Sequence, residues 1–311
     1  MSVLSVQTKK IPELQATTGL VGSDMIIVEL ADGGTRKMTY GDFITAIKAS
    51  LEYPDEAVLS VADVVDVQTN DGTKIPTARL VYDMYQADAV MRREMDCLNG
   101  IREKGNLIDI DTLMGYVRAG EHHKYAIGDY FEDNGVQWAV AARNWYPAWA
   151  FGDGVSRPEH IVCMPVDFLA TSYQFNTSNT NAGGYAASLM PANMETEFGK
   201  LGSKVKAYCK QTRIYENNKG GWAATMRNTR LPTIVEVTGN QGWANEGFSG
   251  GVCSQLPLCQ NSLFRIRSTW YWCLDPSSSD TTYFCSVNGD GGSINSNASG
   301  SGRVRPLIVL A

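Results

Sequence analysis

Seven cysteines and three histidines are the side chains of this 311-residue chain that best suit metal or thiol chemistry. Zinc sites place such side chains at short, regular spacings. No C-x-x-C pair occurs, however, and His122, His123 and His160 do not lie at ligand spacing from any cysteine. We therefore predict no metal site and no cofactor. We expect most of the cysteines to be small buried apolar residues rather than members of a disulfide scaffold.

Two kinds of catalytic site can be weighed from the remaining reactive residues. Cys273 and Cys285 could face each other on adjacent strands, but an activated thiol needs an electropositive neighbour or a metal. The nearest charges in the sequence are Asp275 and Asp280, which are negative. Glycan hydrolysis needs two opposed carboxylates, and no motif selects such a pair among the 33 acidic residues. We do not expect an enzyme.

Binding is the chemistry that the C-terminal end favours. Apolar residues 283–287 lead into a tract rich in Gly, Ser and Asn, and the chain turns apolar again at residues 304–310. Small polar side chains on a fixed scaffold offer adaptable hydrogen bonds, and aromatic residues add contact area at little entropic cost. The alternative is a solvated loop without a partner. The candidate ligand-binding residues are Tyr271, Asp275, Ser277, Ser278, Asp280, Thr281, Tyr283, Asn288, Asp290, Asn295 and Asn297.

Three strand-like segments, 270–274, 283–287 and 304–310, must position these residues. Their side chains alternate as on a strand, and Trp270, Trp272 and Phe284 are expected to form the buried scaffold. The loops between the segments should lie on neighbouring parts of one surface, with the last segment closing the sheet. Pro306 restricts that segment to an edge position or to the start of a strand.

Further regular structure is predicted upstream of this sheet. Strands are expected on both sides of the turn "EDNG" and in "HIVCMPVDFL". A helical region follows, separated from an earlier turn at Pro191 and broken near Gly199 and Gly202. Its apolar face comprises Met194, Phe198, Leu201, Val205 and Tyr208. The fold class is α+β, and residues 105–311 form a domain with a small antiparallel sheet and long loops.

Residues 1–52 are predicted to form a small α+β module. A strand in "DMIIVEL", a turn at "ADGG" and a strand in "TRKMTY" form a hairpin, and an amphipathic helix follows over residues 40–51. One helix on one hairpin buries little apolar surface. We therefore expect the module to pack against a partner or against its own copies.

Residues 53–104 are predicted to form a connector with a strand within residues 57–68 and a helix over residues 78–101. Apolar residues of this helix recur at alternating steps of three and four, which is the a/d pattern of a coiled coil, with Asp88 as its polar break. Two interpretations stay open: an amphipathic helix docked on its own domain, or a short parallel bundle of three or two copies. The oligomerisation residues would be Val81, Met84, Met91, Met95 and Leu98.

Composition excludes two classes of partner. The formal net charge is −6 and no Lys/Arg cluster stands out, so we expect no nucleic-acid binding. No segment approaches the roughly 18 apolar residues of a membrane span, so we expect no membrane insertion. The first residues hold no apolar run of signal-peptide length, so we expect synthesis in a cytoplasm without a classical export signal.

The C-terminal stretch "RIRSTWYWCLDPSSSDTTYFCSVNGDGGSINSNASGSGRVRPLIVL" resembles C-type-lectin-like domains from gut bacteria and their phages. The resemblance covers about residues 120–311 and includes the upstream elements "GGYAAS" and "LPTIVEV". It implies the fold shared by formylglycine-generating enzymes and by the variable proteins of diversity-generating retroelements. In the variable proteins, diversified residues near the C-terminal end form a ligand-binding surface. The residues that carry the resemblance are Trp270, Trp272, Pro276, Ser277, Ser278, Phe284, Val287, Ala298, Val304, Arg305 and Pro306.

The N-terminal segments "KKIPELQATTGLVGSDMIIVELADGGTRKMTYGDF" and "DGTKIPTARLVYDM" resemble the attachment module and the start of the trimerising helix of phage fibres. Together the resemblances imply a virion fibre protein that binds a host cell-surface glycan or protein. It would be a homotrimer attached to a phage tail or capsid protein through residues 1–52. Two alternatives are a purely structural decoration of the capsid or tail and, less favoured, a thiol-oxidising enzyme of the formylglycine-generating type.

Overall fold

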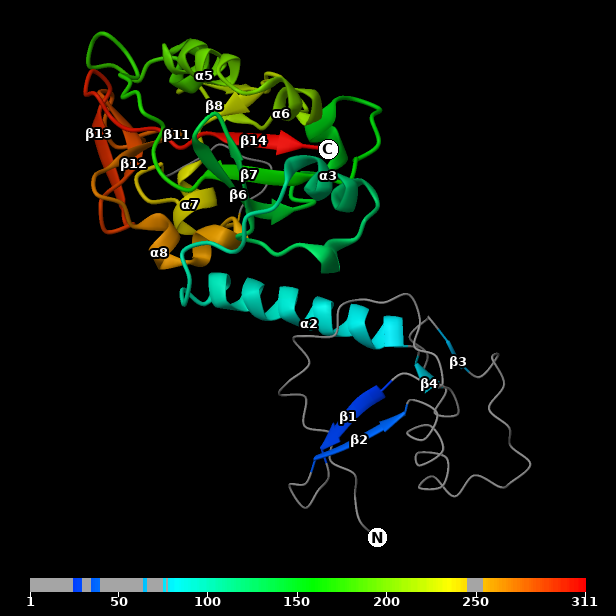
Figure 1. Ribbon diagram of the computed structural model, residues 1–311. Helices are drawn as coiled ribbons and strands as arrows, with labels where there is room; N and C mark the ends of the chain where they lie inside the picture. Colours follow the sequence, from blue (N-terminus) through cyan, green and yellow to red (C-terminus); the bar gives the residue numbers. More distant parts are fainter. Residues whose placement is uncertain (1–24, 30–34, 40–63, 66–74, 77, 245–253) are drawn as a thin grey trace. The chain divides into compact units, whose positions relative to one another are not determined.

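A computed structural model describes residues 25–29, 35–39, 64–65, 75–76, 78–244 and 254–311 of the chain. The chain falls into two compact units, residues Met1–Gln86 and Ala87–Ala311 (Figure 1). Both helices and antiparallel sheets are present, as predicted for an α+β fold. None of the helices in the described ranges is long and apolar enough to cross a membrane.

The N-terminal unit contains the predicted hairpin. Strands β1 (Met25–Glu29) and β2 (Thr35–Thr39) pair antiparallel, which confirms the assignment made from their β-branched residues. Strands β3 (Val64–Val65) and β4 (Ile75–Pro76) pair in parallel. Strand β3 lies within the strand predicted for residues 57–68, and the other residues of that range lie outside the described ones. The predicted helix over residues 40–51 lies outside the described residues.

Helix α2 (Ala78–Leu98) crosses the limit between the two units. Two ion pairs join its C-terminal half to the second unit. Arg93 donates from Nε and Nη2 to the buried carboxylate of Asp129 at 2.7 and 2.8 Å, and Arg143 pairs with Glu94. The helix is therefore docked on the C-terminal unit from about residue 87 onward. The domain limits predicted at residues 52 and 104 stay a prediction.

A five-stranded antiparallel sheet forms the centre of the C-terminal unit. Helices α3 (Ile110–Arg118) and α6 (Ser203–Tyr208) supply apolar side chains to the core on one face, and the segments that follow β10 cover the other. The hairpin around "EDNG" and the strand in "HIVCMPVDFL" are both confirmed here. The strand order is β10 (Thr229–Arg230), β14 (Leu307–Leu310), β7 (Ile161–Pro165), β6 (Val136–Arg143) and β5 (Tyr130–Asp133).

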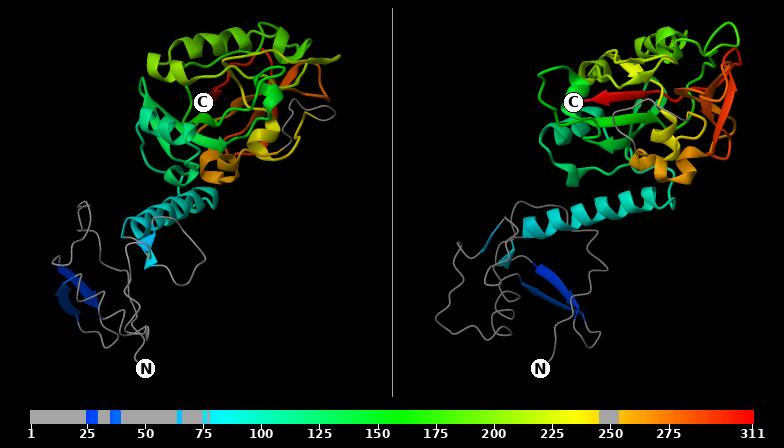
Figure 2. Two further views of the ribbon diagram at one scale, coloured as in Figure 1. Left: turned by 90° about the vertical axis from the view of Figure 1, so that its right-hand side faces the viewer. Right: turned by 180° about the vertical axis from the view of Figure 1, so that it is seen from behind.

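A separate three-stranded sheet lies at the end of this unit away from α3 (Figures 1 and 2). Strands β11 (Tyr271–Pro276) and β12 (Tyr283–Val287) occur where they were predicted. Two expectations were wrong. The Ser/Asn tract contains a third strand, β13 (Ser293–Asn297), which pairs with β12. Strand β14 starts directly after Pro306, as proline allows, but it lies inside the five-stranded sheet and does not close the three-stranded one.

The helical region also has the predicted breaks. Helix α5 (Met190–Gly199) begins with Pro191 in its first turn and ends before α6, and α4 (Gly184–Ala187) is the separate turn that precedes it. The remaining short elements are the 3₁₀ turns His122–Lys124, Ala148–Phe151 and Pro257–Gln260, strands β8 (Glu216–Asn217) and β9 (Trp222–Ala223), and helices α7 (Ile234–Thr238) and α8 (Ser262–Arg265).

Candidate functional site

Stacked aromatic side chains hold the three-stranded sheet in place. Phe284 of β12 stacks on Phe175 with ring centroids 3.7 Å apart, and the edge of Trp272 approaches Phe175 at 4.9 Å. Trp272 also donates from Nε1 to the carbonyl of Tyr173 at 2.8 Å, so its polar atom is satisfied although the side chain is fully buried. Trp270 meets Trp272 edge to face with ring centroids 4.7 Å apart and is partly buried. These residues are scaffold, as the sequence indicated.

Three of the predicted ligand-binding residues are also part of the scaffold. Tyr271, Asp275 and Ser277 are fully buried. The carboxylate of Asp275 accepts a hydrogen bond from the Ile234 amide at 2.7 Å, and burial raises the pKa of Tyr271 above its ordinary value. The assignment of Tyr271 and Asp275 as ligand contacts is wrong because both faces of β11 are covered, so alternation along the strand does not expose every second side chain. Ser277 follows the strand directly and is buried as well.

The other eight candidates are at least partly exposed; seven of them occupy two separate places, and one lies between these places. The turn between β11 and β12 carries Ser278, Asp280 and Thr281, and the pairing of Tyr283 with Asn297 adds the ends of β12 and β13 to it. The turn between β12 and β13 carries Asn288 and Asp290 at the opposite end of β12, and Asn295 lies between the two places, opposite Cys285.

The length of β12 decides how far apart these places are. Strand β12 has 5 residues, which at about 3.3 Å per residue separates the two turns by roughly 15 Å. The expectation that the two loops adjoin on one surface therefore holds for the end of the tract, where Asn297 pairs with Tyr283, and fails for its beginning at Asn288 and Asp290. The exposed polar residues form a turn site at one end of the sheet, and the hairpin tip with Asn288 and Asp290 is a separate feature.

Asn181 fixes the backbone of the turn site from below. This buried residue places its side-chain Nδ2 within 3.1, 2.7 and 2.8 Å of the carbonyl oxygens of Ser277, Asp280 and Tyr283. Its own amide donates to the carbonyl of Thr281 at 2.7 Å. The shape of the turn thus depends on a residue about a hundred positions upstream, while the exposed side chain of Thr281 is left available for contacts.

Replacing Asn181 by Ala is expected to loosen this turn selectively. Three carbonyl oxygens lose a common donor in a buried place, which should cost about 1–3 kcal/mol of unfolding free energy. Hydrogen exchange of the amides at residues 277–283 should become at least tenfold faster, while that of β7 stays unchanged. Asn179→Ala, an exposed change in the same loop, is the control. Equal exchange in both variants would show that Asn181 does not hold the turn.

Two neighbours of the turn were not among the predicted site residues. Trp243 is 47% exposed, and its carbonyl oxygen accepts hydrogen bonds from the backbone amide of Ser278 at 3.0 Å and from its hydroxyl at 3.2 Å. Lys219 donates from Nζ to the carbonyl of Ser277 at 2.9 Å. Both lie far from the turn in sequence, and the glycines near each of them, Gly220 and Gly221 after Lys219 and Gly242 before Trp243, indicate loops. An exposed Trp beside polar side chains is typical of a binding surface.

The thiols next to the site are not activated for chemistry. Cys273 and Cys285 are buried, and burial, followed by the charge of Asp275, raises the pKa of each thiol above its ordinary value. A nucleophilic thiol needs the opposite shift. No group of three or more His, Cys, Asp or Glu side chains suited to a metal ion occurs in the part of the chain that the structure describes.

Comparison with known proteins adds no relative to this picture: the chain matches no protein-family model, and no curated protein or solved structure is significantly similar to it.

Proposed function

We propose that this chain is a fibre or adhesin protein of a bacteriophage virion, and that its C-terminal unit is a C-type-lectin-like domain that binds a host cell-surface ligand. The observation that carries the proposal is the turn site. Exposed polar groups and Trp243 sit on a sheet whose large aromatic side chains are buried and stacked beneath it. A rigid support with adaptable polar groups at its surface is the arrangement that binding loops use.

Cell binding of the full chain tests the proposal. The variant Trp243→Ala, Thr281→Ala, Asn297→Ala removes the exposed aromatic ring and two exposed polar groups of the turn site. Binding to host cells should weaken at least tenfold because contact energy concentrates in a few such anchors. The melting temperature should change by only a few degrees, since exposed substitutions usually cost less than about 0.5 kcal/mol each.

A matched variant controls for general surface effects. Thr196→Ala, Ser203→Ala and Lys210→Ala are exposed changes on or after α5 and α6, outside the turn site. This variant should bind cells as the wild type does. If the turn-site variant also keeps full binding at unaltered stability, the recognition surface lies elsewhere. If the wild type binds no host cell but is present on intact particles, the purely structural alternative is correct.

Helix α2 supports the proposal that the fibre is a homotrimer. Val90 and Cys97 on one side of the helix are buried against the C-terminal unit. Met91 and Met95, both on the predicted a/d seam, are 61% and 55% exposed, and Leu98 is partly buried. The helix is therefore docked, as one interpretation held, and it still presents part of an apolar seam. The side chains of Val81 and Met84 lie outside the described residues.

Charge on this seam should prevent self-association. Met91→Glu, Met95→Glu would place like charges at adjacent core positions of a parallel bundle. Light scattering should show a trimer for the wild type and a monomer for this variant at micromolar concentration. Met91→Leu, Met95→Leu keeps the apolar volume and should leave the trimer intact. A monomeric wild type would refute the assembly. Attachment to a tail or capsid protein through residues 1–52 is part of the same proposal.

A further inference from the structure

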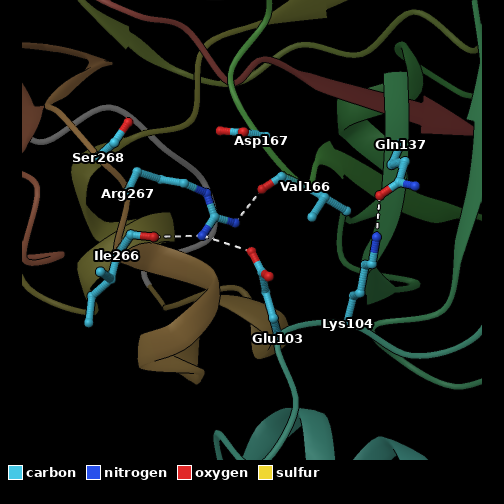
Figure 3. A pocket seen from close by; sticks show the side chains of 8 residues that line it. All are labelled: Glu103, Lys104, Gln137, Val166, Asp167, Ile266, Arg267 and Ser268. Atoms are coloured by element: carbon cyan, nitrogen blue, oxygen red, sulfur yellow. Dashed lines mark hydrogen bonds and ion pairs between the residues drawn. The ribbon is translucent and has the colours of Figure 1, made fainter. Parts of the chain in front are cut away.

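A pocket of the C-terminal unit lies away from the turn site and is lined mainly by polar and charged side chains. Its volume is about 620 Å³, within the usual range of small-molecule sites. Four chain segments meet there: the loop after α2, the start of β6, the residues after β7 and the link from α8 to β11 (Figure 3). The lining residues are Glu103, Lys104, Gln137, Val166, Asp167, Ile266, Arg267 and Ser268.

The positive charge at this pocket belongs to two buried arginine side chains. The Arg267 side chain is only 7% exposed; its guanidinium group donates to the carbonyl oxygens of Leu263, Ile266 and Val166, while its Nε has no partner among the described residues. Arg305 lies directly beneath, fully buried, and shares the Val166 carbonyl and the ring of Phe264 with Arg267. Burial, and then the neighbouring Arg305, lowers the pKa of Arg267 to about 10.

The negative charges of the pocket are, in contrast, solvated. Glu103 pairs with Arg267 at 3.0 Å, but its side chain is 47% exposed, and Asp167 is exposed as well. Figure 3 shows these two carboxylates on opposite sides of the guanidinium group. Arg305 donates to the carbonyl oxygens of Pro165, Phe264 and Val166 and forms no ion pair with a carboxylate in the described ranges. Lys104 donates to Gln137 and lies over the ring of Tyr130. A buried cation without a desolvated counter-ion favours an anion from solution.

We propose that this pocket binds an acidic sugar. Its carboxylate would lie between Lys104 and Arg267 and replace the solvated Glu103 as the counter-ion. The ring hydroxyls match the remaining lining, because Gln137, Ser268 and Asp167 together supply donors and acceptors. Neither the turn site nor host-cell binding enters this inference, so each can fail without the other.

Titration of the full chain with methyl β-glucuronide, followed by calorimetry and ligand-observed NMR, tests the inference. The neutral methyl β-glucoside should bind at least tenfold more weakly, because it lacks the carboxylate. Lys104→Gln should weaken glucuronide binding at least tenfold, while Lys210→Gln, an exposed lysine outside the pocket, should not. Glu103→Gln should instead strengthen binding severalfold, since it removes the competing carboxylate. Arg267→Lys should weaken binding if that variant folds, and Lys104→Gln decides the matter if it does not.

Three outcomes would overturn the inference. Equal binding of glucoside and glucuronide would remove the role of the carboxylate. Displacement of the glucuronide by acetate or sulfate at equal concentration would reduce the pocket to a general anion site. Unchanged binding in Lys104→Gln would place the ligand elsewhere on the chain.

Discussion

Replacing Trp272 by Ala is expected to lower the free energy of unfolding by about 3–5 kcal/mol, the usual cost of removing a large buried aromatic side chain. Trp272 is fully buried and contacts Phe175 and Trp270. Its loss also leaves the carbonyl oxygen of Tyr173 without the indole donor. Phe284→Ala should cost a similar amount, because its ring stacks on Phe175 at 3.7 Å. Chemical denaturation measures both values.

A tryptophan at the surface provides the control for this prediction. Trp222 is 51% exposed, and Trp222→Ala should cost about 1 kcal/mol or less. Comparable losses for Trp222 and Trp272 would show that the aromatic stack does not hold the sheet. If Trp272→Ala is severely destabilised, loss of cell binding in that variant says nothing about ligand contacts. For this reason the variant that tests the turn site leaves the aromatic side chains beneath the sheet unchanged.

The C-terminal tract is needed for packing as well as for exposing polar groups to a ligand. A Cβ atom at Gly302 would lie 2.3 Å from the ring of Trp270 and 2.7 Å from Nε1 of Trp272. No other residue fits between these two indoles without moving them. The sequence alone shows a run of small polar residues, and it cannot show which of them an aromatic ring requires to be small. Part of the tract therefore belongs to the scaffold.

Local patterns predicted the elements that carry strong periodicity. The hairpin β5–β6, strand β7 and the helices divided at Gly199 and Gly202 were found where apolar spacing and turn residues indicated them. Strand β13 was missed because Ser and Asn have low strand propensity, and its pairing with β12 outweighs that preference. The membership of β14 in a different sheet depends on long-range pairing, which no local pattern encodes.

The sequence predicted where the candidate site lies but not which of its residues are exposed. Thr281 and Asn297 are exposed as expected, whereas Tyr271 and Asp275 are buried, because segments distant in sequence cover both faces of β11. Trp243 joins the turn through hydrogen bonds between its backbone and Ser278. These hydrogen bonds join positions that are distant in sequence, so no local pattern could predict them.

A buried ion pair beneath the three-stranded sheet carries the second large expected effect. Arg230 and Glu236 have side chains that are 4% and 2% exposed, and two guanidinium nitrogens meet the two carboxylate oxygens at 2.7 and 2.8 Å. Tyr146 donates its hydroxyl to Glu236 at 2.9 Å, and Glu236 closes the capping box of α7 with Thr233. Burial alone would raise the pKa of Glu236, but Arg230 outweighs it and the net pKa lies below its ordinary value.

Arg230→Met should therefore cost about 3–5 kcal/mol at neutral pH, because it leaves the Glu236 carboxylate buried without its cation. In the wild type the contribution of the pair is present above the unfolded pKa of Glu236 and is lost as the pH falls through its lowered folded pKa. In the Arg230→Met variant, burial without the cation should raise the folded pKa of Glu236 above the unfolded one. The variant's loss of unfolding free energy relative to the wild type should therefore shrink as the pH is lowered from 7 towards 5.

The double change Arg230→Met, Glu236→Gln separates charge from packing. Gln keeps an acceptor for Tyr146 and for the cap of α7, so the double variant should be more stable at neutral pH than Arg230→Met alone. Its stability should also lose the pH dependence between 5 and 7 that the single variant shows. Lys204→Ala, which removes the exposed partner of Asp111, is the matched control and should leave the melting temperature unchanged. A pH-independent deficit in Arg230→Met would mean that lost packing, and not the stranded carboxylate, destabilises the sheet.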